Sequence, residues 1–193
     1  MQSEYINPAE YEKLYSAMQY ANVLAMRIAV ETGLRIDDVL SLTWGDLDGR
    51  KLRFTAKKTG KGGTKTLSAD LCRRLELFRG GKNEFLFPGR DHTKHRTRQS
   101  VYKDVKRAAV RLGITGHISP HSARKTYAVT VRQTQGLAAA QRELQHSRMD
   151  TTMLYAFSDI MAAKPQAAQP AAVDLEKLAD LIAERIIKKL ATP

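Results

Sequence analysis

A single strand-pair signal within a chain of otherwise helical segments is the feature that most limits the possible folds. Residues 51–56 alternate as a β-strand does, 57–63 (KKTGKGG) read as a basic, glycine-rich turn, and 65–67 begin a return strand. A short third strand is expected at 84–87, closed by Pro88 and Gly89. So little strand predicts a mainly α fold with a small antiparallel β-sheet (α+β), and it argues against all-β and doubly wound folds.

Helical signals lie on both sides of this hairpin. Asn7 is a good N-cap, Pro8 suits the first helical position, and apolar residues at helical spacing predict one helix that continues to Gly33. Further helices are expected at about 36–42, 70–79, 99–111, from Ser119 and Pro120 to about 135, 137–144 and 151–161.

The composition changes after residue 161, which indicates a domain boundary. Residues 162–172 (AAKPQAAQPAA) have the Ala/Pro composition of a linker, and 173–190 place apolar residues on one stripe of an amphipathic helix. We therefore expect a main domain at 1–161, a linker at 162–172 and a C-terminal segment at 173–193. That helix could dock on its own domain, but a flexible linker favours a contact with a neighbouring protomer.

The charge balance points to a polyanionic partner. Lys and Arg number 32 against 20 Asp and Glu, so the net charge is +12, and nucleic acid is the most common partner of such a protein. The alternative is a protein that is basic only for solubility. Cys72 is the only cysteine, which excludes an intramolecular disulfide and a Cys-rich zinc site. With no membrane-length apolar run and no signal peptide, we expect a cytoplasmic protein without a membrane partner.

Four short segments, in a fixed order, carry groups that could act on a phosphate: residues 32–38 (TGLRIDD), 57–61, 120–124 and 146–155. Each residue alone has a structural explanation; Arg35, for example, could simply pair with Asp38. Together, two arginines, a lysine and two histidines would stabilise a phosphate whose charge grows as it becomes pentavalent. A tyrosine hydroxyl is a potential nucleophile. No acidic cluster stands ready for two magnesium ions, so metal-dependent nuclease chemistry is poorly supported.

These segments resemble the tyrosine recombinase (phage integrase) family. The matching residues are TGLRIDDVLSLTW at 32–44, KKTGK at 57–61, HSARKT at 121–126 and LQHSRMDTTMLYA at 144–156. The resemblance covers about residues 8–160 and implies that 1–161 form a catalytic domain of that fold. It further implies an enzyme that cleaves and rejoins DNA at specific sites through a 3′-phosphotyrosine intermediate, without metal or nucleotide cofactor.

The same resemblance implies a role for each matching residue: the catalytic set would be Arg35, Lys58, His121, Arg124, His146 and Tyr155. The two arginines would clamp the scissile phosphate, and the two histidines would bind its oxygens and assist proton transfer. Lys58 would be the general acid for the departing 5′-hydroxyl, and Tyr155 would attack the phosphorus. Asp38 would support the phosphate-binding residues from behind.

Some positions depart from the family pattern or compete for a role. Gln145 stands where the family usually has Gly, and Lys125 stands where it often has another His. Lys57 and Lys61 compete with Lys58 for the lysine role, but Lys-Thr-Gly is the matching triplet and favours Lys58. Tyr127, three residues after Arg124, is the rival nucleophile, and a core or supporting role is the favoured interpretation for it.

The basic loop at 89–98 (GRDHTKHRTR) is interpreted as a phosphate contact, with a merely solvated loop as the alternative. The DNA-binding residues predicted from this loop and from the hairpin turn are Lys57, Lys61, Arg90, Lys94, Arg96 and Arg98. His92 and His95 lack a third and fourth ligand in this loop, so no metal is expected there.

The partners implied by the resemblance are double-stranded DNA and further copies of the chain, as a tetramer that passes through a Holliday junction. A phage or mobile element is the expected origin. Family members usually have an N-terminal core-binding domain, and this chain begins almost directly with the catalytic domain, so a fragment or a minimal member is expected. The alternatives are a DNA-relaxing enzyme resembling type IB topoisomerases, a non-catalytic DNA-binding module and, with aromatics at only 7%, a basic RNA-binding protein.

Overall fold

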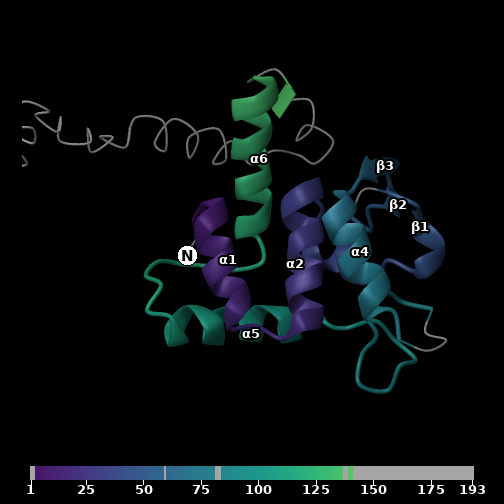
Figure 1. Ribbon diagram of the computed structural model, residues 1–193, viewed down its shortest axis with the longest axis horizontal. Helices are drawn as coiled ribbons and strands as arrows, with labels where there is room; N and C mark the ends of the chain where they lie inside the picture. Colours follow the sequence, from purple (N-terminus) through teal and green to yellow (C-terminus); the bar gives the residue numbers. More distant parts are fainter. Residues whose placement is uncertain (1–2, 59, 81–83, 137–138, 141–193) are drawn as a thin grey trace, which may run out of the picture. The chain divides into compact units, whose positions relative to one another are not determined.

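The computed structural model describes residues 3–58, 60–80, 84–136 and 139–140. The helices are α1 (Pro8–Ser16), α2 (Tyr20–Thr32), α3 (Ile36–Leu40), α4 (Ala69–Phe78), α5 (Arg98–Arg111) and α6 (Ser122–Gln135), with a short 3₁₀ turn η1 (Trp44–Asp46). The strands are β1 (Leu47–Asp48), β2 (Lys51–Thr55) and β3 (Gly62–Thr66). The predicted class, mainly α with a small antiparallel sheet, is confirmed (Figure 1).

The predicted hairpin is present as β2 and β3, which pair antiparallel in a sheet of order β1-β2-β3. The return strand begins at Gly62, earlier than the expected residue 65, because Gly62 and Gly63 pair with Thr55 and Phe54 instead of belonging to the turn. Leu52 pairs with Lys65 and Thr55 with Gly62, which fixes the register. The turn is tight: the Ala56 amide donates to the Lys61 carbonyl at 2.9 Å, and the Gly60 amide donates to the Ala56 carbonyl at 2.8 Å. Gly60 takes a φ of +65°, which favours glycine there.

The single helix expected up to Gly33 is instead two helices, α1 and α2, separated at residues 17–19. Gln19 is extended (φ −65°, ψ 135°) and begins α2 without a cap from its own side chain. The buried Asp104 of α5 supplies the cap, because its Oδ2 accepts from the Gln19 amide at 2.9 Å and from Asn22 Nδ2 at 2.6 Å. A distant carboxylate therefore places the break.

The expected strand at 84–87 is also corrected, because the third strand of the sheet is β1. Residues near Phe85 form only an isolated bridge with Thr43. The Trp44 amide donates to the Glu84 carbonyl and the Leu86 amide to the Leu42 carbonyl, both at 2.9 Å. The segment thus runs antiparallel to the residues that follow α3 and does not join the sheet.

The last described helix begins later than the Ser119 and Pro120 signal indicates, since α6 starts at Ser122 with His121 as its cap residue. The preceding residues form a tight turn in which the Ser122 amide donates to the Ser119 carbonyl at 2.9 Å. The helices expected at 137–144 and 151–161 lie largely outside the described residues, as do the linker at 162–172 and the segment 173–193.

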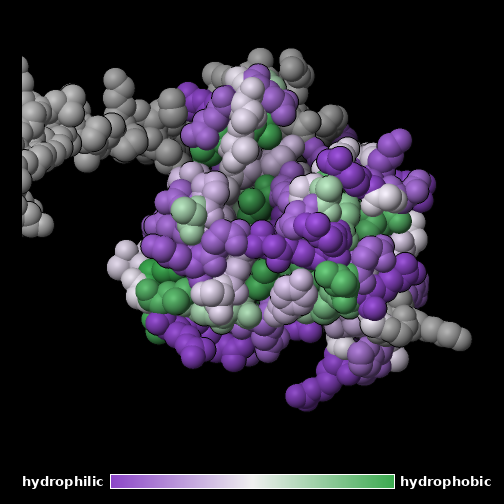
Figure 2. Space-filling model, viewed as in Figure 1, coloured by the Kyte–Doolittle hydropathy of each residue, from purple (hydrophilic) through white to green (hydrophobic). Residues whose placement is uncertain are grey.

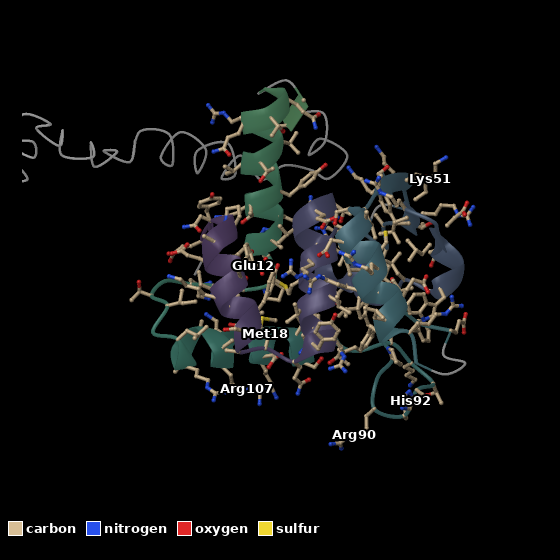
Figure 3. The ribbon with its side chains drawn as sticks, viewed as in Figure 1. Glu12, Met18, Lys51, Arg90, His92 and Arg107 are labelled. Atoms are coloured by element: carbon tan, nitrogen blue, oxygen red, sulfur yellow. The ribbon has the colours of Figure 1, made fainter. Side chains whose placement is uncertain are left out.

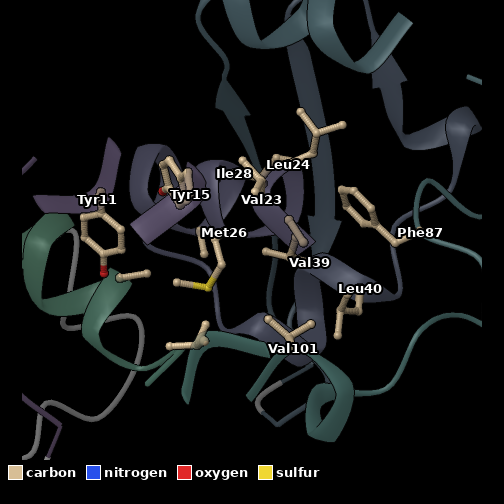
Figure 4. Close-up of a cluster of buried hydrophobic side chains, with 14 of the residues drawn as sticks. Tyr11, Tyr15, Val23, Leu24, Met26, Ile28, Val39, Leu40, Phe87 and Val101 are labelled. Carbon is tan, nitrogen blue, oxygen red and sulfur yellow. The ribbon is translucent and has the colours of Figure 1, made fainter. Parts of the chain in front are cut away.

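Helix α2 is the centre of the core. Its residues Leu24, Met26 and Ile28 are fully buried, and the helix packs against α3, α4 and α6 (Figure 1). Tyr11 of α1 and Val101 of α5 complete this cluster of buried side chains (Figure 4). A helix buried on most sides has little freedom to shift, so its C-terminal end is a rigid base for the residues that follow it. Among the described helices, none is both long and apolar enough to cross a membrane.

Candidate active site

A pocket of about 410 Å³ lies where the start of α3, the first turns of α5 and the segment that leads into α6 meet. Its lining residues are Arg35, Ile36, Asp37, Arg98, Gln99, Tyr102, Ser119, Pro120, His121 and Arg124. Arg35, His121 and Arg124 are members of the predicted catalytic set, and the fold brings all three to one cavity.

The turn after α2 places Arg35 at the pocket. Gly33 ends α2 in the left-handed conformation (φ +70°), and Arg35 is extended (φ −69°, ψ 146°) as the cap residue of α3. The hydroxyl of Thr32 accepts from the Leu34 amide at 3.3 Å and so helps to fix the turn. The local sequence TGLR therefore directs the backbone from one buried helix into the next at the position of the arginine.

Arg124, in the first turn of α6, is tied to the same turn because its Nη1 donates to the carbonyl of Gly33. Burial, followed by the nearby Arg35 guanidinium, lowers the pKa of Arg124 to about 10, while the Asp38 carboxylate opposes this shift. The fold thus holds the positive charges of Arg35 and Arg124 near each other where solvent access is reduced. An anion such as a phosphate would relieve their repulsion and accept hydrogen bonds from both guanidinium groups.

His121 reaches the pocket from the turn before α6. Its backbone amide donates to Ser119 Oγ at 3.2 Å, and the Ser119 amide donates to Ser122 Oγ at 3.3 Å. These bonds fix the start of α6 beside the pocket. The N-terminal end of a helix of 14 residues carries partial positive charge, which adds to the attraction for an anion.

Asp38 is not among the residues that line the pocket, and it is only 4% exposed. Its Oδ1 accepts from the backbone amide of Lys57 at 3.0 Å, so it fixes the base of the hairpin turn to α3. Lys58 is exposed on that turn and is not among the residues that line the pocket. His146 and Tyr155, the remaining members of the predicted catalytic set, lie outside the described residues.

The predicted DNA-binding residues occupy different environments. Arg98 lines the pocket, with its Nη1 3.7 Å from Asp37 Oδ2. Arg96 is half-buried, and its Nη1 donates to Gln19 Oε1 at 3.2 Å and to Asn22 Oδ1 at 3.3 Å. The structure therefore gives Arg96 a role in holding the loop to α2, and its contact with DNA stays a prediction.

The other members of that set are exposed. Lys61 lies on the hairpin, and Arg90 and Lys94 lie on the loop; Figure 3 shows Arg90 and His92 at the outer end of this loop. Lys57 is exposed too, but its Nζ lies 3.2 Å from His95 Nε2. Hydrophilic residues cover much of the face seen in Figure 2. Within the described ranges, no group of three or more His, Cys, Asp or Glu is arranged to hold a metal ion.

Tyr127, for which the sequence favours a core or supporting role, lies against Gly33, and it is bonded to Lys65, a residue to which the sequence assigns no role in the site. Tyr127 accepts a hydrogen bond from Lys65 Nζ at 3.1 Å, and its ring fills the space next to Gly33. A Cβ on Gly33 would lie 2.3 Å from Tyr127 Cδ1. The glycine at the end of α2 is a visible signal for a left-handed cap, but nothing in the local sequence indicates which side chain approaches it.

Gly33→Ala is expected to destabilise the protein by about 3 kcal/mol, because a left-handed alanine is strained and the new methyl group must displace the Tyr127 ring. Chemical denaturation measures this loss. Gly49→Ala is the matched control, since Gly49 has a φ of +56° with nothing within 4 Å of an added Cβ. It should lose only about 1 kcal/mol, and equal losses for the two variants would contradict the contact with Tyr127.

Comparison with known proteins gives a consistent result. The model of the phage integrase family matches residues 4–160. Tyrosine recombinase XerC of Xanthomonas campestris pv. campestris (strain B100) is 31% identical over 157 residues, which are 76% of this chain and 48% of the relative. Tyrosine recombinase XerD of Listeria monocytogenes serotype 4b (strain F2365) is 29% identical, over 78% of this chain and 56% of the relative. The chain thus spans about half the length of the curated relatives it matches.

Solved structures share the fold. The catalytic core of lambda integrase matches with a TM-score of 0.62 and 23% identity, over 77% of this chain and 94% of that one. The XerH site-specific recombinase, bound to a palindromic difH substrate after cleavage, matches with a TM-score of 0.66 and 22% identity, over 84% of this chain and 52% of that one. On the family match over residues 4–160 and this shared fold, the chain belongs to the phage integrase family.

Proposed function

We propose that this chain is the catalytic domain of a site-specific DNA recombinase, which cleaves and rejoins DNA through a 3′-phosphotyrosine intermediate. The observation that carries the proposal is the meeting of Arg35, His121 and Arg124 in one pocket at the start of a helix. Two guanidinium groups, an imidazole and a helix N-terminus are the groups that stabilise a phosphate as it becomes pentavalent. Relatives named tyrosine recombinases support the same reaction.

In the proposed reaction, the hydroxyl oxygen of Tyr155 attacks the scissile phosphorus, and its proton passes to His121 or His146, the histidines expected to assist proton transfer. A bond forms between phosphorus and the tyrosine oxygen while the bond to the 5′-oxygen breaks, and Lys58 gives its proton to that leaving oxygen. Arg35 and Arg124 stabilise the added charge. The 5′-hydroxyl of another strand then attacks the phosphotyrosine and releases the tyrosine. Each step exchanges one phosphodiester for another, so no nucleotide is consumed.

Double-stranded DNA is the proposed partner, with the chain acting as a tetramer in the cytoplasm. Support comes from lambda integrase, whose solved structures include a dimer bound to a COC′ core site and a tetramer bound to a Holliday junction. Residues 173–193 are the segment proposed to contact a neighbouring protomer. Origin in a phage or another mobile element belongs to the same proposal.

Covalent trapping tests the function directly. The protein is mixed with a library of nicked duplexes in EDTA, the reaction is stopped with SDS, and DNA from any protein adduct is sequenced. We expect an adduct on a 3′-phosphate at a recurring sequence, formed without metal. Adducts spread over all sequences would indicate a relaxing enzyme, and salt-sensitive DNA binding without any adduct would indicate a binding module.

A further inference from the structure

We propose that Lys65 and Tyr127 are positioning residues that hold the hairpin carrying Lys58 in place against the helix carrying His121 and Arg124. This inference rests on the proposed function, because it assigns a task to the general acid of that reaction. The inference is based on two contacts. Lys65 of β3 is bonded to Tyr127 of α6, and the Tyr127 ring lies against Gly33, whose carbonyl accepts a hydrogen bond from Arg124.

Lys65 connects β3 to α6. The other four residues of this strand are exposed, and Lys65 alone is half-buried. Its Nζ donates to the Tyr127 hydroxyl at 3.1 Å and lies 5.3 Å from the centre of the Tyr127 ring. Lys65 also pairs with Leu52 of β2, which is fully buried. The bond to Tyr127 is therefore placed to restrain the whole hairpin.

Tyr127 carries this restraint to the phosphate-binding residues. Its ring lies against Gly33, and the Gly33 carbonyl accepts from Arg124. Tyr127 follows Arg124 by three residues on α6, so both side chains lie on the same face of the helix. A shift of the tyrosine would move the backbone that holds the arginine. The hairpin and the pocket are thus connected through one aromatic side chain.

The tip of the hairpin needs such a restraint because Lys58, Gly60 and Lys61 are all exposed. Two contacts of the tip with other elements act at Lys57, whose amide donates to Asp38 Oδ1 and whose Nζ lies near His95 Nε2. Those contacts lead to α3 and to the loop at 89–98, whereas the bond between Lys65 and Tyr127 leads to α6. A general acid must lie within hydrogen-bonding reach of the leaving oxygen, so small displacements of Lys58 are expected to slow the reaction.

The leaving group provides a specific readout. When the bond from phosphorus to the 5′-oxygen breaks, the oxygen must receive a proton from the Lys58 ammonium group. A substrate with sulfur in place of that bridging oxygen releases a thiolate, which is stable without a proton. A defect confined to the position of Lys58 should therefore appear on the oxygen substrate and disappear on the sulfur substrate.

The experiment measures single-turnover cleavage by the full chain on both forms of the duplex identified by trapping. Tyr127→Phe keeps the ring but loses the hydroxyl, and Lys65→Met loses the donor. We expect each variant to be about 10- to 100-fold slower on the oxygen substrate and within about 3-fold of the native protein on the sulfur substrate. Lys65→Arg, which keeps a donor, should retain most of the oxygen-substrate rate.

Two comparisons separate the possible failures. Lys51→Met changes an exposed lysine of the same hairpin and should leave both rates unchanged. Lys58→Met should be slow on oxygen and restored on sulfur; if sulfur does not restore it, the proposed role of Lys58 fails. Suppose that the sulfur substrate restores the rate of Lys58→Met. The positioning role is then overturned if Lys65→Met and Tyr127→Phe cleave both substrates equally slowly, or if they cleave both at the native rate.

Discussion

Tyr155→Phe is expected to abolish the covalent protein–DNA adduct while DNA binding is retained. Phenylalanine keeps the ring of the side chain but lacks the oxygen that would form the bond to phosphorus, so the covalent adduct cannot form. The groups that are proposed to bind the phosphate keep their charge in this variant and should still hold the duplex. SDS trapping measures the adduct, and a gel-shift titration at fixed salt measures binding.

Two other tyrosines provide the controls for this experiment. Tyr102 of α5 is the one described tyrosine among the residues that line the pocket, and it is 42% exposed. Tyr127 is bonded to Lys65. Both Tyr102→Phe and Tyr127→Phe should still form an adduct. An undiminished adduct from Tyr155→Phe, together with its loss from Tyr102→Phe, would move the nucleophile to α5.

The elements that the sequence predicts well are those whose ends are set by neighbouring residues. Helix α4 begins after Ser68, whose hydroxyl accepts from the Leu71 amide, and α5 begins after Thr97, whose hydroxyl accepts from the Ser100 amide. Both helices lie within one residue of their expected bounds at each end. The β2–β3 hairpin is equally local, because alternation and a glycine-rich turn specify it.

The errors arise where a distant group decides the local conformation. The apolar spacing before Gly33 suits one continuous helix, and the break between α1 and α2 depends on Asp104, far along the chain. The segment near Phe85 has strand character, but it pairs with Thr43 and so stays outside the sheet. Neither partner could be read from the residues near the element.

The site also contains residues that the sequence identifies and residues that only a distant contact identifies. Arg35, His121 and Arg124 were predicted from a resemblance between motifs, and the fold brings them to one pocket. Lys65 gave no such signal, since it is one of many lysines in a basic chain and lies in a mostly exposed strand. Its importance depends on a contact between β3 and α6, and such a contact exists only once the chain has folded.

Arg124→Ala is expected to lower the cleavage rate by about 10²- to 10³-fold, because removing one donor to a developing oxyanion costs about 3–4 kcal/mol of transition-state stabilisation. The side chain is held for this task by the Gly33 carbonyl. Its pKa, lowered to about 10 by burial and by Arg35, indicates that the free protein gains little stability from this charge. The loss should therefore appear in the rate far more than in the thermal midpoint.

Arg27→Ala is the matched control, because Arg27 is a half-buried arginine with a purely structural environment. Its Nη2 lies 2.6 Å from Glu12 Oε2, and its guanidinium lies 4.6 Å from the centre of the Tyr15 ring. This variant should lower the thermal midpoint at least as much as Arg124→Ala and leave the cleavage rate within about 2-fold of the native protein. A rate for Arg124→Ala within 10-fold of the native value would contradict its role. A loss of stability in Arg27→Ala and a loss of cleavage rate in Arg124→Ala would distinguish a residue that stabilises the fold from one that acts on the phosphate.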